Sequence, residues 1–286
     1  MKKKILTLGL VIITLLLTGC KSDSMEDIKI YTSVYPIEYV TKELYGEYAD
    51  IYNMYPQGIN PYDYKFTDKQ ISDFADSDLV IYNGIDDEKD LVVKMIDKNK
   101  NIKIIDATNK IDYTYTMDEL WINPSNILMI AKNVKEGLQE YVSSKTIDKE
   151  IESNYDKLKI DLSSIDAELK EIAENSENTT ILVSSNQFNF LSKYGFNIIS
   201  LDDETFTESY YLSAVDLINN GTIEYIFSVK GSEDNENVKK ILEECTNLKK
   251  AEIDTINNIT TNDKNEGIDY LTIMNENIDK LKKELY

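Results

Sequence analysis

The sequence predicts an α/β protein with two lobes, each with a mainly parallel sheet flanked by helices, joined by one long linking α-helix. Two observations predict this fold. Strand-like and helix-like segments alternate on both sides of residues 146–178, and such alternation is typical of parallel sheets covered by helices. Within 146–178, apolar side chains recur every three or four residues, which places them on one stripe of a helix: Ile151, Tyr155, Leu158, Leu162, Ile165, Leu169 and Ile172.

The linking segment is uninterrupted, because no Gly or Pro occurs between Gly137 and Gly195. At about 1.5 Å per residue, some 28 helical residues would reach roughly 40 Å. Two structures fit this pattern: a coiled coil of three heptads, or a single rigid helix laid against other elements of a globular protein. The alternation on both sides favours the single helix.

The residues before the linking helix supply the N-terminal lobe, which we place at 28–145. We expect its strands at 28–36, 49–56, 78–84 and 102–108, and its helices at 37–46, 88–97 and 125–142. Thr67 and Gln70 have the spacing of a capping box, which predicts a further short helix after Thr67. Ser125 or Asn126 is the expected cap of helix 125–142.

The C-terminal lobe is placed at 179–286. We expect strands at 179–185, 196–201, 222–229 and 251–256, and helices at 187–195, 210–221, 235–247 and 267–285. Loops at strand ends carry the ligands in open α/β sheets, and four loops stand out: 57–66, 113–124, 184–188 and 254–262. Two lobes facing each other would bring these four loops to one cleft.

Composition limits the partners of the chain. Its 286 residues are 42% hydrophobic with 10 Gly and 4 Pro, which suits a packed protein of two domains. The formal charge is −21, with neither His nor Arg. Such a surface repels nucleic-acid phosphates, so we expect no nucleic-acid partner. It also repels an anionic membrane, so attachment there needs a covalent anchor.

The N-terminus predicts that anchor. Residues 1–20 read MKKKILTLGLVIITLLLTGC, with an apolar run that is too short to span a membrane comfortably but suits a signal peptide. The last four residues resemble the bacterial lipobox, in which the Cys is lipidated; an ordinary cleaved signal with an incidental Cys is the alternative. We predict a signal peptide at 1–19, lipidation of Cys20, and a polar tether at 20–27. The other cysteine, Cys245, lies in a helical pattern and is expected to be a buried thiol.

A resemblance to a known family rests on six ordered features. A family loop, Pro-Pro-Gly-x-x-Pro-His-Asp-Tyr, corresponds to Pro56-Gln57-Gly58-Ile59-Asn60-Pro61-Tyr62-Asp63-Tyr64. The family's Tyr-Asn-Gly corresponds to 82–84, its Asp-Pro-His-x-Trp-x-x-Pro segment to 118–124, and its Thr-Ser-His (or Glu)-x-x-Phe segment to 184–188. A late strand-end Asp corresponds to Asp254, and the closing pattern to Tyr270, Met274, Asn277 and Leu281.

On these segments the chain resembles the solute-binding lipoproteins of bacterial ABC importers for zinc, manganese and iron, over essentially its whole mature length. The resemblance implies a monomer, lipid-anchored on the extracytoplasmic face of the cell membrane, with a permease and an ATPase as partners. Family members place two or three His in their metal site, and this chain has none. Transferred position by position, the metal ligands become Tyr62, Glu119, Asn186 and Asp254, with Ser185 as the alternative to Asn186.

Four oxygen-bearing side chains suit a hard cation such as Mn²⁺, Mg²⁺ or Ca²⁺, or ferric iron if Tyr62 ionises. A zinc site with nitrogen ligands is excluded because imidazole is absent. We therefore expect a metal ion whose identity is open, with manganese or iron favoured over zinc. The alternative is the same fold with a decayed or altered site, serving as a surface adhesion or interaction lipoprotein or binding a non-metal solute.

Three further expectations concern the surroundings of the cleft. Trp121 is expected to pack in the core beside it rather than contact a ligand. The acidic loop 202–208 is expected to be a solvated loop, with a cation-collecting gate as the alternative. The chain is not expected to be an enzyme, because it lacks a His base, a phosphate-binding loop and a Ser–His–Asp set. An acid/base pair of Glu119 and Asp254 would need a separation that the sequence does not fix.

Overall fold

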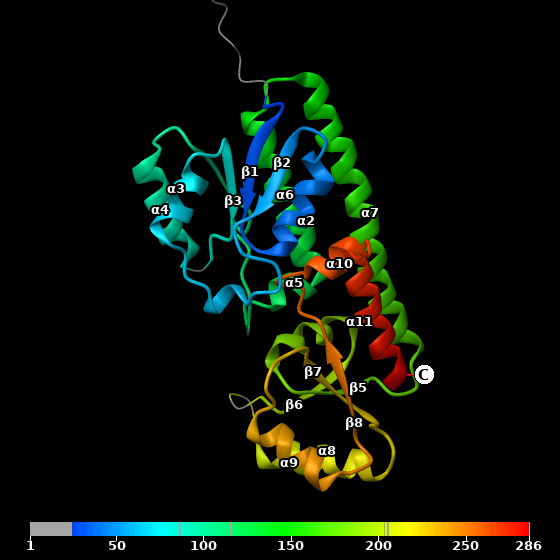
Figure 1. Ribbon diagram of the computed structural model, residues 1–286. Helices are drawn as coiled ribbons and strands as arrows, with labels where there is room; N and C mark the ends of the chain where they lie inside the picture. The colour runs from blue at the N-terminus through cyan, green and yellow to red at the C-terminus, as the bar shows by residue number, and fades with distance from the viewer. Residues whose placement is uncertain (1–24, 86, 115, 203, 205, 286) are drawn as a thin grey trace, which may run out of the picture.

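A computed structural model describes residues 25–85, 87–114, 116–202, 204 and 206–285. The predicted signal peptide and Cys20 lie outside these residues. Figure 1 shows two lobes, one above the other, with the long helix α7 (Lys145–Asn175) running beside both. In the part of the chain that the structure describes, no helix is both long enough and apolar enough to cross a membrane.

The N-terminal lobe is a three-layer sandwich around a parallel sheet of order β2-β1-β3-β4. The strands are β1 (Ile28–Thr32), β2 (Ala49–Asn53), β3 (Leu79–Tyr82) and β4 (Lys103–Asp106). The helices are α2 (Tyr35–Tyr45), η1 (Pro61–Asp63), α3 (Asp68–Ala75), α4 (Glu88–Lys98), α5 (Glu119–Ile122) and α6 (Pro124–Tyr141). Successive side chains of a strand face opposite layers: Leu79 and Ile81 join the core under α2 and α6, and Val80 joins the core under α3 and α4.

The C-terminal lobe repeats this arrangement with sheet order β6-β5-β7-β8, again all parallel. Its strands are β5 (Thr180–Val183), β6 (Asn197–Ser200), β7 (Tyr225–Val229) and β8 (Lys249–Ile253). Its helices are η2 (Asn186–Tyr194), α8 (Glu208–Asn219), α9 (Glu236–Glu244), α10 (Thr261–Asn265) and α11 (Tyr270–Leu285). Helices α8 and α9 cover one face, and Cys245 is buried with them as expected.

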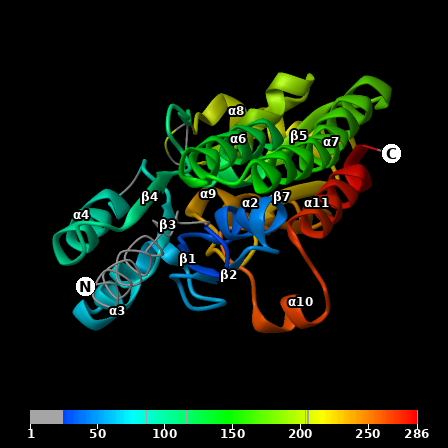
Figure 2. The ribbon, with the colours of Figure 1, turned by 90° about the horizontal axis from the view of Figure 1, so that it is seen from above.

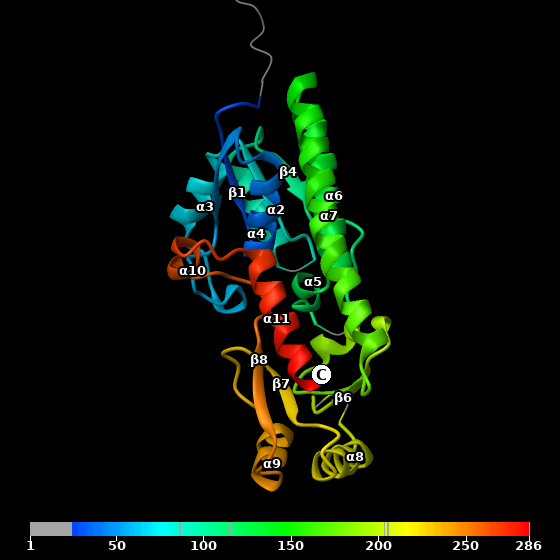
Figure 3. The same cartoon turned by 90° about the vertical axis from the view of Figure 1, so that its right-hand side faces the viewer.

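The linking segment is one continuous helix packed against other elements, so the single-helix interpretation is confirmed and the coiled coil is not. Six of the seven stripe residues are buried, and the seventh, Tyr155, packs at the edge of the same core. Figure 3 shows α7 upright beside the N-terminal lobe and reaching down to the C-terminal lobe, and in Figure 2 it lies along α6. Both lobes therefore pack against α7 through this apolar stripe.

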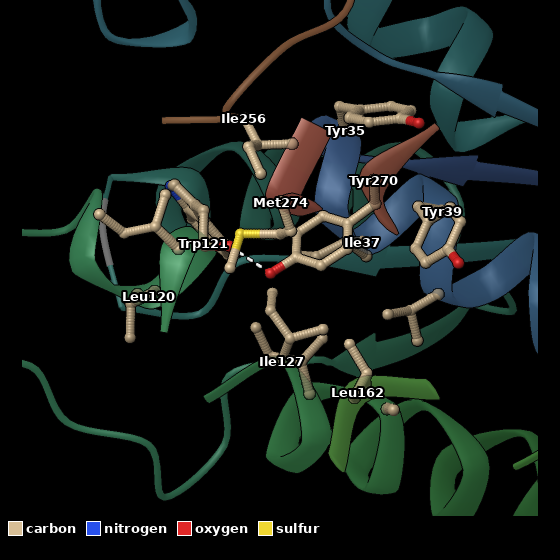
Figure 4. Packing of buried hydrophobic residues seen from close by; sticks show 14 of the residues in the cluster. Tyr35, Ile37, Tyr39, Leu120, Trp121, Ile127, Leu162, Ile256, Tyr270 and Met274 are labelled. Carbon is tan, nitrogen blue, oxygen red and sulfur yellow. Dashed lines mark hydrogen bonds between the residues drawn. The ribbon is translucent and has the colours of Figure 1, made fainter. Parts of the chain in front are cut away.

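The core under α7 is continuous from one lobe to the other. Figure 4 shows the junction, where side chains from α2, α5, α6, α7 and α11 meet around Tyr270 and Trp121. Both rings are fully buried. A core shared by the two lobes resists their separation, because opening them would expose apolar surface to water.

The structure corrects several predicted boundaries. The first strand ends at Thr32 rather than 36, because Pro36 sits in the first turn of α2, where its missing N–H is tolerated. Helix α6 is capped by Asn123, which accepts a hydrogen bond from the Ser125 backbone N–H, and not by Ser125 or Asn126. The predicted capping box at Thr67 and Gln70 is confirmed. The short helices α5 and α10 were expected to be loop.

Candidate metal-binding cleft

A cavity of about 390 Å³ opens between the lobes. It is lined from the N-terminal lobe by residues of the loop after β2 and by Asp118, just before α5. The C-terminal lobe contributes the segments that follow β7 and β8. Of the four predicted ligands, Tyr62 and Asp254 line this cavity. The predicted convergence of strand-end loops therefore holds for the loops at 57–66, 113–124 and 254–262.

Tyr62 is held on Asp118. It lies in η1, which Asn60 caps by accepting the Tyr62 backbone N–H. The Tyr62 phenol donates to Asp118 Oδ1 at 2.6 Å, and the Trp121 indole N–H donates to the Tyr62 oxygen at 3.3 Å. Trp121 is fully buried, as expected, so a rigid side chain fixes the phenol in the cleft.

Asp118 carries the clearest electrostatic signature in the cleft. Burial raises the pKa of its carboxyl, and the hydrogen bonds from Tyr62 and Asn257 offset only part of that rise. A carboxylate removed from water gains more from a neighbouring positive charge than one in solvent does. The site therefore favours a cation beside Asp118.

Asp254 is oriented by its backbone and by both its side-chain oxygens. Its N–H donates to Asn277 Oδ1 at 3.0 Å, and the Asn277 amide returns a bond to the Asp254 carbonyl at 2.8 Å. Asp254 Oδ1 accepts the Ile256 backbone N–H at 2.8 Å, and Oδ2 accepts the Lys230 ammonium at 2.9 Å. This bond raises the pKa of Lys230, which keeps the ammonium charged.

The turn after Asp254 contains a strained residue. Ile256 is fully buried and has φ of 60°, a left-handed conformation that a β-branched side chain rarely adopts. Its side chain points into the shared core in Figure 4. Because the core holds Ile256 in this conformation, the chain turns sharply and presents Asn257 and Asn258 to the cleft.

The other two predicted ligands, Glu119 and Asn186, are not on the lining of this cavity. Glu119 is 7% exposed, and its carboxylate accepts the Thr114 backbone N–H at 3.3 Å. Asn186 is 2% exposed; its backbone N–H donates to Asp202 Oδ2 at 3.1 Å and its side-chain oxygen accepts from Asn189. Two of the four predicted side chains therefore line one cavity, and the other two are buried away from its lining.

A second polar cavity, of about 260 Å³, adjoins the first and shares Asp118, Val229 and Ser232 with it. The loop 184–188 reaches the cleft here through Ser184, Ser185 and Gln187. Asp202, the first acidic residue of 202–208, also lines this cavity, and its carboxylate accepts two backbone N–H groups. That part of the acidic loop organises η2 rather than being merely solvated.

Sequence reasoning missed Asp118, Asn257 and Lys230. Asp118 precedes Glu119 within a segment that was singled out, so proximity in sequence marked the segment but not which side chain faces the cleft. Lys230 follows the last residue of β7. The rule that strand-end loops carry ligands would have pointed to Lys230 had it been applied to that strand.

The segment after Asp254, residues 257–264, closes the cleft against the N-terminal lobe. Thr261 donates to Gln57 Oε1 at 2.6 Å, and Gly58 N–H donates to the Ile259 carbonyl at 3.2 Å. Lys264 of α10 pairs with the buried carboxylate of Glu38 in α2 at 2.7 Å. We call residues 257–264 the strap, because they belong to the C-terminal part of the chain yet bond to the N-terminal lobe.

The donor set is one of oxygens. The cavity lining offers the Tyr62 phenol, the carboxylates of Asp118, Asp254 and Asp263, and several amide groups. Among the described residues, no group of three or more His, Cys, Asp and Glu side chains is arranged to hold a metal ion. Carboxylate, amide and water oxygens together suit hard cations that retain part of their hydration.

The chain belongs to the ZnuA family, described as "Zinc-uptake complex component A periplasmic", whose family model matches residues 30–284. It is 24% identical to the metal ABC transporter substrate-binding lipoprotein SsaB of Streptococcus sanguinis, over 93% of this chain and 92% of SsaB. It is 26% identical to the iron ABC transporter substrate-binding lipoprotein MtsA of Streptococcus pyogenes, over 68% and 69% of the two chains. The zinc-binding lipoprotein AdcA of Streptococcus pneumoniae is 20% identical over 98% of this chain, which spans only 61% of AdcA.

Solved structures share the fold. The metal-dependent lipoprotein YcdH of Bacillus subtilis superposes with a TM-score of 0.74 at 18% identity, over 91% of this chain and 99% of YcdH. The Zn(II)-bound ZnuA-like domain of Streptococcus pneumoniae AdcA gives a TM-score of 0.71 at 18% identity, over 91% and 99%. The two-lobed fold and the family predicted from the sequence are confirmed.

Proposed function

We propose that this chain is the extracytoplasmic solute-binding lipoprotein of a metal-ion ABC importer, and that it captures a divalent or ferric cation through oxygen ligands in the cleft between its lobes. One observation carries the proposal. The phenol of Tyr62 donates to the partly buried carboxylate of Asp118, and Asp254 from the other lobe lines the same cavity. Oxygen ligands from both lobes thus face one space.

The proposed ligands are Tyr62, Asp118 and Asp254, with Glu119 and Asn186 completing the set when the lobes close on the cation. Each of the last two directly adjoins, in sequence, a residue that lines the cleft. Manganese or iron fits this set better than zinc, because the chain has no His and its described cysteine, Cys245, lies in the core of the C-terminal lobe.

Lipidation of Cys20 would hold the protein on the outer face of the membrane, where it would deliver the cation to a permease and an ATPase. The names of the relatives support this placement, since SsaB and MtsA are substrate-binding lipoproteins of ABC transporters. The expectation that the chain is not an enzyme stays a prediction, which these transport names favour. They give no support to the alternative role in surface adhesion.

Calorimetric titration tests the proposal. Both lobes and their cores lie within residues 25–285, so a chain without residues 1–20 suffices. We expect saturable binding of Mn²⁺ or Fe³⁺ that Asp118→Asn and Asp254→Asn each weaken at least tenfold. Asp216→Asn, on the outer helix α8, is the matched control and should leave the affinity unchanged. Absence of saturable binding for Mn²⁺, Fe³⁺, Ca²⁺ and Zn²⁺ would overturn the proposal.

Glu119→Gln decides the ligand set. If closure brings Glu119 to the cation, this variant loses affinity as Asp118→Asn does. If only Asp118→Asn loses affinity, Asp118 takes the position that the family resemblance gives to Glu119.

A further inference from the structure

Each oxygen of the Asp254 carboxylate already has a partner, and the partner of one is a lysine. Oδ1 is committed to the backbone N–H of Ile256, which closes the strained turn. Oδ2 is 2.9 Å from the ammonium nitrogen of Lys230. Lys230 and Asp254 both line the interlobe cavity, so this ion pair lies inside the proposed capture site.

The pair is built into the sheet. Strands β7 and β8 run parallel with Val229 opposite Ile253, and Lys230 N–H donates to the Ile253 carbonyl at 2.8 Å. Lys230 follows the last residue of β7 and Asp254 follows the last residue of β8, so the two lie side by side at the carboxyl end of the sheet, which faces the cleft. This register keeps the ammonium near the carboxylate whatever the lobes do, because both residues belong to one lobe.

We infer that Lys230 is a built-in counter-cation that competes with the captured metal ion for Asp254 and thereby speeds its release. This inference rests on the proposed function. A metal ion on Oδ2 would lie within a few ångströms of the ammonium, and two positive charges at that separation repel. Capture therefore requires the Lys230 side chain to swing away, and 57% of that side chain is exposed, which leaves it room to do so.

The same pair explains how the empty cleft tolerates its negative charge. Asp254 and Asp263 line one cavity, and Asp118 lies across it. Acidic groups without a nearby positive charge would repel one another. Lys230 supplies that charge when no metal ion is present and returns to Asp254 as the ion leaves. When the cation leaves, the ion pair between Lys230 and Asp254 forms again, so the carboxylate does not lose its positive partner.

The test measures affinity and release of Mn²⁺ with the chain lacking residues 1–20. Lys230→Met removes the ammonium while keeping a side chain of similar length, and Lys230→Arg retains the charge. Lys249→Met is the matched control: Lys249 is as exposed as Lys230 and pairs with Glu224 at 2.7 Å, at the opposite end of the same two strands. Calorimetry gives the affinity, and electron paramagnetic resonance of freed Mn²⁺ after addition of a chelator gives the release rate.

We expect Lys230→Met to bind Mn²⁺ at least tenfold more tightly and to release it correspondingly more slowly, with Lys230→Arg and Lys249→Met within threefold of the unaltered chain. Equal or weaker binding by Lys230→Met, beside clear binding by the unaltered chain, overturns this inference and leaves the proposed function standing. An equal gain in Lys249→Met also overturns it, because net charge alone would then account for the effect. Binding by Lys230→Met alone overturns both the proposed function and this inference, because the unaltered chain would then capture no ion to release. Absence of binding by every variant also overturns both.

Discussion

The phenol of Tyr270 in α11 donates a hydrogen bond of 2.7 Å to the backbone carbonyl of Trp121 in α5, 149 residues earlier in the chain. Both side chains are fully buried (Figure 4). The bond ties the last helix to the segment that carries Asp118, and Trp121 in turn donates to Tyr62. The junction between the lobes is therefore also the support of the cleft.

Tyr270→Phe should destabilise the protein by about 1–2 kcal/mol, because the Trp121 carbonyl would remain buried without this donor. Urea unfolding followed by circular dichroism measures the change. Tyr210→Phe is the control, since Tyr210 is 53% exposed, and it should leave the free energy of unfolding unaltered. An equal effect of both substitutions would contradict the role given to the bond.

Lys264→Met should loosen the strap. The Glu38 carboxylate is 2% exposed and would retain Lys42 but lose Lys264. Although burial raises the pKa of Glu38, its two lysines lower it below the ordinary value. We expect a loss of about 1–2 kcal/mol of stability and faster amide hydrogen exchange at 257–264. Lys239→Met, which breaks an exposed pair on α9, should do neither. Unchanged exchange in the strap would contradict the prediction.

Glu284 should make stability fall as the pH rises towards neutrality. Burial raises the pKa of Glu284 to about 7, against 4.5 for the free group. Between these values the folded protein binds a proton that the unfolded chain has released, so each rise in pH favours unfolding. Glu284→Gln should remove this part of the pH dependence. Urea midpoints at pH 5 and pH 8 test this prediction, with Glu276→Gln on the exposed side of α11 as the control. The same change in midpoint between the two pH values in the unaltered chain, Glu284→Gln and Glu276→Gln would contradict it.

Closure on a cation should change the overall dimensions little. One core runs through both lobes along α7, and the strap bonds the lobes on the side of the cleft. A wide opening would break both. X-ray scattering with and without Mn²⁺ should give radii of gyration that agree within the error of measurement. A clear decrease in the radius of gyration when Mn²⁺ binds would show that the lobes close through a wide movement instead.

Much of the fold could be predicted from local pattern. The stripe from Ile151 to Ile172 showed a helix too long for one lobe, and the alternation of strands and helices showed parallel sheets. Thr67 and Gln70 marked a helix start because capping depends on neighbouring residues alone. The short helices α5 and α10 were not predicted, because a helix of about one turn shows no periodicity in its sequence and depends on tertiary contacts.

The site was less predictable for a physical reason. The family resemblance placed Tyr62 and Asp254 on the cleft lining, but which of Asp118 and Glu119 faces the cavity depends on the rotation of α5, set by the packing of Trp121. Lys230 meets Asp254 through the register of β7 and β8. Register follows from pairing between distant segments, which one sequence read alone does not specify.

The two sheets have the same strand order, β2-β1-β3-β4 and β6-β5-β7-β8. The loops at the carboxyl ends of the strands are therefore arranged in the same way in each lobe, and they lie outside the packed sheet and helix layers. Substituting a loop residue alters what the gap prefers without disturbing the interior that supports it. The fold shared with YcdH at a TM-score of 0.74 and only 18% identity shows how much substitution this architecture accommodates.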